Sequence, residues 1–463
     1  MKHLVFILFS ALLALPSAVG AQSAASATAA QPAIPDDPDS LFETDAPGAA
    51  APGTPPSARL FQAKAVEVGG ALYSDYTGFL TWNDSSPDPA NLSAGASSRF
   101  VPNLEADLYV DARPFENVRV FTKFKAAYPF SSTLSGPGTL AIPSFSVFEV
   151  YADINWNDRF YFRVGQQVVN WGVGYFFSPA DIISLTPIDP LRPDLERPGP
   201  LALKINAPFA DVDNLYLYVV ANQAFARDGT FRLDDFAVAP KVEVLIGGWE
   251  IGIGAYYQNN QRPKAMMTAT GSLFGQLGLF AEGVLSRGMD RIVVQETAGA
   301  PGTFQTSTDS TTPTLSGTIG ARWLQTDWHL SFTAQYYYNG QGYADYAGER
   351  AASSAYALQL QSMPPFGPPL SQADVFQPGR HYLAGLASWT DILGSRVDLA
   401  LFYEGNLSDG SGVTSPSISF TPFRYFTLTF APSISHGGDN TELVSLFGRF
   451  SLSMKLTIGT VSF

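Results

Sequence analysis

Apolar and polar residues alternate along most of the chain after about Phe61. In Leu104–Arg113 the even-numbered residues are apolar, and the odd-numbered residues are charged or tyrosine. The same period of two runs through Val118–Tyr128 and through Phe148–Trp156, where Phe148 belongs to the apolar set. Successive side chains of a β-strand point to opposite faces, so this period predicts strands with one apolar and one polar face.

The connections between these segments alternate between short and long. The short, turn-like connections are Pro114–Asn117, Asn157-Asp158, Pro208–Asp213, Gly247-Gly248, Gly275, Gln325–Asp327, Asp391–Gly394 and Pro422-Phe423. The long connections are Asn83–Val101, Pro129–Ser144, Val169–Gly199, Gln223–Phe236, Asn259–Pro263, Gly288–Pro313, Asn339–Gly379, Gly405–Thr414 and Ser435–Arg449. Eight short and nine long connections join about 18 strands, in the alternation typical of a transmembrane antiparallel barrel. The weakest predicted strands are Leu201–Ala207, Lys264–Gly271 and Ser415–Thr421, and loss of two would leave about 16.

Composition separates this barrel from a soluble sandwich, whose strands also alternate. Hydrophobic residues are 46% of the chain, yet no long apolar stretch follows Leu15, which excludes a helical membrane protein. Charged residues are only 15%, against about 25% in soluble domains. Apolar faces often end in aromatic residues, as at Trp82, Trp156 and Trp323, and such girdles mark the membrane interfaces of barrels. We expect an all-β transmembrane barrel over residues 61–463.

The first 60 residues differ in character from the rest of the chain. A basic start, an apolar run from Leu4 to Leu15 and small residues up to Ala21 predict a secretory signal peptide over 1–21. The apolar run is shorter than the roughly 20 residues that a membrane anchor needs. Residues 22–60 are rich in Ala and Pro and predict a disordered periplasmic segment, with docking of Leu41-Phe42 on a partner as the alternative.

The last strand ends in Thr457–Phe463. A final strand that closes on phenylalanine resembles the C-terminal signature of outer-membrane barrels of Gram-negative bacteria. The resemblance implies that the barrel-insertion machinery reads Phe463 and that the protein is located in the cell outer membrane. Val461 and Phe463 have the opposite parity from the aliphatic residues before them, so a bulge near Gly459 is needed to bring them to the lipid face.

The polar faces of successive strands carry charges of alternating sign. Acidic residues of Leu104–Arg113 are followed by basic residues, then by acidic and again by basic ones. The inward candidates are Arg119, Lys123, Lys125, Glu149, Asp153, Arg159, Arg163 and Lys204. Opposite charges on neighbouring strands predict an ion ladder that stabilises the wall. The second interpretation is that the basic rows favour anionic solutes, since charged rings set the selectivity of pores.

The stretch from Val164 to Gly199 is the most distinctive part of the sequence. Its Trp-Gly, Pro-Asp and Arg-Pro-Gly elements resemble a family of uncharacterised porin-like proteins, with Gln166 where that family often has arginine. Residues 170–199 combine aromatic and aliphatic residues that a solvated loop would not expose together, so we expect this loop to fold into the barrel and narrow it. Its candidate constriction residues are Trp171, Asp181, Asp189, Arg192 and Arg197. We expect the four charged ones to meet the inner-wall residues Arg159, Arg163, Glu149 and Asp153. The alternative is a surface loop that packs on the rim.

Signals for an enzyme are few. Cysteine is absent, no spacing fits a metal or cofactor site, and the net charge of −14 argues against nucleic acid. Of three histidines after the predicted signal peptide, His436 has Asp439 or Asp409 as conceivable catalytic partners.

The sequence therefore predicts a pore for small solutes, surrounded by outer-membrane lipids and without a cofactor. Three alternatives remain open at this point. They are a channel for hydrophobic solutes that is similar to fatty-acid transporters, a surface adhesin that uses Asn339–Gly379, and an outer-membrane hydrolase.

Overall fold

The computed structural model describes most of the chain between Val66 and Gly459. The described residues are 66–83, 95–129, 143–209, 212–221, 236–259, 261–291, 293–307, 309–343, 348, 355, 379–423, 425–439 and 441–459. The predicted signal peptide, the predicted disordered segment and Phe463 lie outside these residues, so they stay predictions.

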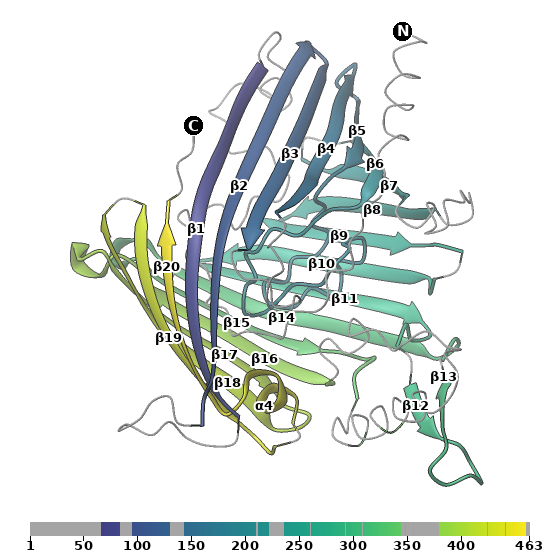
Figure 1. Ribbon diagram of the computed structural model, residues 1–463. Helices are drawn as coiled ribbons and strands as arrows, with labels where there is room; N and C mark the ends of the chain where they lie inside the picture. The colour runs from purple at the N-terminus through teal and green to yellow at the C-terminus, as the bar shows by residue number, and fades with distance from the viewer. Residues whose placement is uncertain are drawn as a thin grey trace.

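Eighteen strands form one antiparallel sheet that closes on itself, because β1 pairs with both β2 and β20 (Figure 1). The strands of the barrel are β1 (Val66–Trp82), β2 (Ser97–Phe115), β3 (Val118–Pro129), β4 (Ser144–Trp156), β5 (Phe160–Gln166), β6 (Leu201–Pro208), β7 (Asn214–Val220), β8 (Ala237–Ile246), β9 (Trp249–Tyr256), β10 (Lys264–Leu273), β11 (Leu277–Arg287), β14 (Pro313–Gln325), β15 (Leu330–Tyr338), β16 (His381–Trp389), β17 (Val397–Asn406), β18 (Ser411–Phe423), β19 (Phe426–His436) and β20 (Phe450–Ile458). The predicted number of 18 is confirmed, and the three weakest predicted segments are β6, β10 and β18.

Some shorter elements lie in the connections. The hairpin of β12 (Val293–Glu296) and β13 (Phe304–Ser307) lies between β11 and β14, and helix α4 (Glu442–Phe447) lies between β19 and β20. Two 3-10 turns, η3 (Thr326–Trp328) and η5 (Ile392–Gly394), close short connections. No helix among the described residues is long and apolar enough to cross a membrane.

The outer face of the sheet is apolar and its inner face is polar, which is the opposite of a soluble protein. Ile253 and Ile319 point outward and are 59% and 62% exposed. The inward side chains of Thr268, Glu282 and Thr318 are instead buried. An apolar outer belt around a polar interior is the pattern of a barrel whose outer face meets lipid. Each of the 18 strands has a hydrogen-bonded neighbour on both sides, which a hydrocarbon environment requires.

The short connections have the turn chemistry that tight hairpins need. Asn157 and Asp158 both have positive φ, at 55° and 54°, and Gly247-Gly248 join β8 to β9 with φ of 61° and 84°. Positive φ at both central residues matches the twist of the flanking strands. Arg159 follows in the same turn and is exposed, so the sequence-based placement of Arg159 on a strand is wrong.

One predicted long loop, Gly405–Thr414, is a tight connection instead. β17 and β18 keep pairing up to Asn406 and Ser411, so only four residues join them. The segment reads as a loop because it is rich in serine and glycine. In the structure, small inward residues of this kind continue along β18 as Ser415, Ser417 and Ser419, all buried.

Candidate pore-lining site

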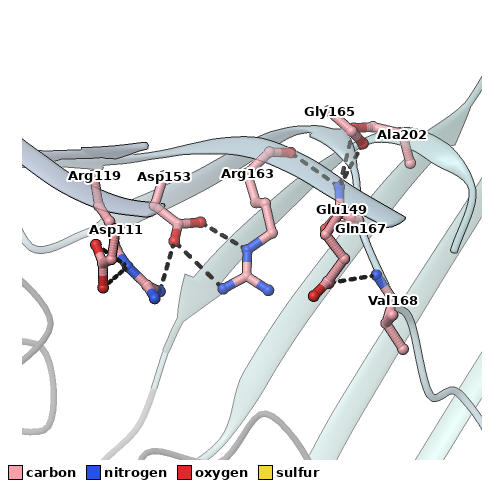
Figure 2. A network of polar contacts seen from close by, with 9 residues as sticks. All are labelled: Asp111, Arg119, Glu149, Asp153, Arg163, Gly165, Gln167, Val168 and Ala202. Carbon is pink, nitrogen blue, oxygen red and sulfur yellow. Dashed lines mark hydrogen bonds and ion pairs between the residues drawn. The ribbon is translucent and has the colours of Figure 1, made fainter. Parts of the chain in front are cut away.

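Four charged side chains on neighbouring strands form a continuous ladder on the inner wall (Figure 2). Arg119 Nε of β3 donates to Asp111 Oδ1 of β2 at 3.0 Å. Arg119 Nη1 also reaches Asp153 Oδ2 of β4 at 3.5 Å, and Arg163 Nε of β5 donates to Asp153 Oδ1 at 2.7 Å. The register places Asp153 opposite both arginines. The predicted ion ladder is confirmed.

A second row lies on the same strands, next to this ladder. Lys123 Nζ is 3.4 Å from Asp107 Oδ2, and Lys125 Nζ is 3.9 Å from Glu105 Oε1. The ring of Phe148 lies under both ammonium groups, at 5.4 and 4.3 Å from its centroid. The expected outward direction of Phe148 is wrong, because the register between β3 and β4 shifts at Lys123 and Phe124. Such a bulge adds one residue and re-aims a side chain.

The connection between β5 and β6 folds into the barrel, as the sequence predicts. Trp171, Phe176 and Phe177 are all at most 2% exposed. Phe177 stacks on Tyr337 of β15 and Phe176 packs edge-on against Phe402 of β17. These strands are far from β5 around the wall, so the segment crosses the interior. We call residues 170–199 the infolded segment.

Buried polar side chains of the wall hold the backbone of the infolded segment. Glu282 on β11 accepts hydrogen bonds from the amides of Val173 at 2.5 Å, Gly174 at 3.1 Å and Ala180 at 3.1 Å. On β8, Lys241 Nζ donates to the carbonyl oxygen of Trp171 at 3.0 Å. Each buried backbone group that gains a partner avoids a desolvation cost, so these contacts fix the path of the segment.

The charges of the infolded segment pair differently from the sequence-based expectation. Asp181 binds Arg197 at 2.8 Å, and Asp189 binds Arg192 at 3.1 Å, so all four are paired within the segment. Their expected pairing with the inner-wall residues Arg159, Arg163, Glu149 and Asp153 is wrong. Glu149 instead accepts a hydrogen bond from the amide of Val168 at 3.1 Å, just before the segment (Figure 2).

Glu196, which the sequence reasoning did not select, forms ion pairs with the wall. Its carboxylate lies 2.7 Å from Lys123 Nζ and 2.8 Å from Lys125 Nζ. Burial works against the charged form, but hydrogen bonds from the two lysines hold the pKa of Glu196 below its usual range. Nothing in the sequence connects Glu196 with residues about 70 positions earlier.

A small cavity lies against the later part of the infolded segment. Its volume is about 330 Å³, and it is lined by Thr186, Pro187, Asp189, Arg192, Leu195, Glu196, Arg197 and Pro198. The structure thus brings three predicted constriction residues together around one cavity. Trp171 and Asp181 lie elsewhere in the segment, and Lys204 on β6 lies over the rings of Tyr216 and Tyr218.

A second connection, between β19 and β20, also packs inside. The α4 residues Leu443, Val444 and Phe447 are buried, and Leu443 and Phe447 belong to the apolar cluster that contains Phe176 and Phe177. Glu442 accepts hydrogen bonds from the Tyr382 hydroxyl and the Asn406 amide, both at 2.6 Å. Burial raises the pKa of Glu442 to about 7. The sequence analysis did not predict this packing. The mostly apolar stretch 443–447 inside a connection could have indicated it, because the apolar residues of 170–199 indicated infolding in the same way.

The inner wall of β18 to β20 differs from the charged sector. Small hydroxyl residues face inward there and pair across strands, as Ser415 with Ser433 at 2.6 Å and Ser419 with Thr429 at 2.9 Å. No residue of β18 is charged among those described. The interior is therefore asymmetric, with its dense ion pairs on β2 to β5.

The two conceivable catalytic partners of His436 are engaged by other groups. Asp439 pairs with Arg449, and Asp409 accepts hydrogen bonds from the Ser411 hydroxyl and the Glu442 amide. His436 stacks on Tyr403 instead. Among the described residues, no group of three histidine or acidic side chains could hold a metal ion.

No protein-family model and no curated protein matches the chain. In solved structures, the chain is similar to OccK9 (OpdG) of Pseudomonas aeruginosa, with a TM-score of 0.47, 10% identity, and coverage of 86% of this chain and 98% of that one. It is similar to OccAB1 of Acinetobacter baumannii, with a TM-score of 0.47, 12% identity, and coverage of 86% and 97%. It is also similar to OmpF of Salmonella typhi, solved in complex with daunomycin, with a TM-score of 0.41, 10% identity, and coverage of 85% and 97%. The expected barrel is confirmed by the structure itself, whose 18 antiparallel strands form one closed sheet.

Proposed function

We propose that the protein is a channel in the outer membrane of a Gram-negative bacterium, through which small solutes diffuse. We further propose that the infolded segment narrows this channel. The apolar outer belt suits contact with outer-membrane lipids, and recognition of Phe463 by the barrel-insertion machinery remains a prediction from sequence. The charged and hydroxyl-rich interior favours water-soluble solutes over hydrophobic ones.

The observation that carries the proposal is the attachment of the infolded segment to nearly opposite walls. Gln335 on β15 binds the backbone at Phe176, while Lys123 and Lys125 on β3 bind Glu196. β3 and β15 are eight strands apart by the shorter way around a ring of 18, counted through β1 and β20. A segment held on both sides across the interior reduces the open cross-section.

The proposal includes no catalytic step. The conceivable partners of His436 are bound to other groups, and the charged residues of the ladder on β2 to β5 are paired with one another. Buried ion pairs on rigid strands are suited to shape a fixed electrostatic field rather than to move protons.

Planar-bilayer recording tests the proposal directly. The folded wild-type barrel is expected to give discrete conductance steps. Deletion of Pro179–Glu196 is expected to raise the single-channel conductance, because it removes most of the segment beyond Phe177, including its attachment to β3 through Glu196. Heat-modifiable mobility on a gel serves as the control that each protein is folded.

Two outcomes would count against the proposal. A folded wild-type barrel that never conducts contradicts the channel and favours the surface adhesin. A folded deletion variant with unchanged conductance contradicts the narrowing by the infolded segment and leaves the channel in place.

A further inference from the structure

Glu196 lies at the meeting point of the infolded segment and the charged wall. Both of its carboxylate oxygens are 2.7 Å from Lys123 Nζ, and Lys125 Nζ is 2.8 Å from Oε2. Its side chain is 50% exposed, whereas those of the lysines are 16% and 17% exposed. The carboxylate therefore stands between two wall cations and the space beside the segment.

The wall offers weaker counter-charges to the same two lysines. Asp107 Oδ2 is 3.4 Å from Lys123 Nζ and 3.9 Å from Lys125 Nζ, and Glu105 Oε1 is 3.9 Å from Lys125 Nζ. Glu196 is thus the nearest carboxylate to both ammonium groups among these three acids. It is also the only one of the three that a loop carries, so its position depends on the infolded segment.

We propose that Glu196 is a specificity-determining residue of the channel, a tethered counter-ion that masks Lys123 and Lys125 from solutes. With Glu196 in place, its carboxylate offsets the charge of Lys123 and Lys125, so the two lysines attract passing anions only weakly. The inference rests on the proposed channel function. The sequence-based expectation was that the basic rows favour anions. The present inference is instead that one loop carboxylate, Glu196, suppresses that preference for anions.

The size of the effect follows from Coulomb's law. Removal of a unit charge about 10 Å from the solute path changes the local concentration of a monovalent ion about two-fold in water. The local concentration of anions rises and that of cations falls, so the ratio of anion to cation permeability should rise roughly four-fold. The change should shrink at high ionic strength, because salt screens the uncovered lysines.

The test compares reversal potentials in a potassium chloride gradient for wild type and two charge-matched variants. Glu196→Gln removes the tethered carboxylate and keeps its size. Asp327→Asn removes the same formal charge in the short turn η3 between β14 and β15. We expect a shift toward anions for E196Q alone, and we expect Glu196→Asp, which keeps the charge, to stay near wild type. Adding Lys123→Gln and Lys125→Gln to E196Q removes two positive charges, so the shift toward anions should disappear and the ratio should lie at or below that of wild type.

The outcomes separate this inference from the proposed function. Conducting channels in which E196Q leaves the permeability ratio unchanged overturn the role of Glu196 and leave the channel standing. An equal shift in D327N overturns it too, because the effect would then be one of total charge. A wild-type barrel that is folded but silent overturns the channel itself.

Discussion

Gln335 of β15 binds the backbone of the infolded segment at Phe176 and at its two neighbours, Tyr175 and Phe177. Its Oε1 accepts the amide hydrogen of Phe176 at 2.7 Å, and its Nε2 donates to the carbonyl oxygen of Phe177 at 2.6 Å. Gln335 is 1% exposed. One side chain thus provides the segment with the pair of hydrogen bonds that the backbone of a neighbouring strand provides in a sheet.

Gln335→Ala is expected to loosen the infolded segment. The variant leaves a buried amide and a buried carbonyl without their partner, at about 1–3 kcal/mol for each such group. The midpoint of thermal unfolding on a gel should fall, and channel recordings should become noisier. Gln276→Ala, in an exposed turn, is the matched control and should behave like wild type. An unchanged midpoint for Gln335→Ala would show that the aromatic contacts alone hold the segment.

Asp153→Asn is expected to weaken the ladder on both sides, since Asp153 binds Arg119 and Arg163. Cross-strand ion pairs contribute about 0.2–1 kcal/mol each. A double-mutant cycle with Arg163→Gln should give a coupling energy in this range. A parallel cycle of Asp153→Asn with Lys264→Gln should be additive, because Lys264 on β10 pairs with Asp290 in the connection after β11. Equal coupling in the two cycles would contradict a local ladder.

The docking of α4 is expected to depend on pH through Glu442. Its pKa is raised in the folded protein to about 7, from an ordinary value of 4.5, so the folded state binds more protons between these values. Stability should therefore fall as pH rises from about 4.5 to about 7. Glu442→Gln imitates the protonated carboxyl and should remove this part of the dependence.

Unfolding midpoints between pH 5 and pH 8, measured for wild type and Glu442→Gln, check this expectation. Burial also raises the pKa of Asp194, to about 6, so Asp194 likewise lowers stability as the pH rises. Both proteins contain Asp194, so the difference between their unfolding midpoints reports on Glu442 alone. Parallel pH curves for wild type and Glu442→Gln would show that Glu442 does not titrate in this range.

Gly165→Ala is expected to disturb the pairing of β4 with β5. A Cβ at this position would lie 2.1 Å from the carbonyl oxygen of Val150, and the backbone has a φ of 138°. Positive φ of this kind costs a residue other than glycine on the order of 1–3 kcal/mol. Gly78→Ala on β1 is the control, because a Cβ there meets nothing within 4 Å. Equal unfolding midpoints for the two variants would contradict the special role of Gly165.

The architecture and the ion ladder of the wall could be predicted from the sequence, and the contacts of the infolded segment with the wall could not. Alternation and turn chemistry predict strands because they are local properties, so even weak segments such as Lys264–Gly271 were found. The apolar residues of 170–199 also predict infolding, since burial depends on composition. The contact of Glu196 with Lys123 depends on how a long loop crosses the interior, which no local pattern encodes. The bulge at Phe148 could not be predicted either. One inserted residue turns a side chain from the outer to the inner face of the sheet and leaves the composition of the strand unchanged.

The seam of the barrel joins residues that are very far apart along the chain. Thr457 Oγ1 donates to Asp75 Oδ1 at 2.6 Å, across a separation of 382 residues, and Lys455 Nζ lies 3.2 Å from Asp75 Oδ2. Closure of so long a loop carries a large entropic cost and is slow, because every intervening strand must first find its neighbour. Until β20 reaches β1, the sheet keeps two open edges that could recruit strands of another molecule. An unclosed sheet is therefore open to aggregation at these two edges, and Asp75 contributes inward polar contacts that hold the edges together once the barrel is closed.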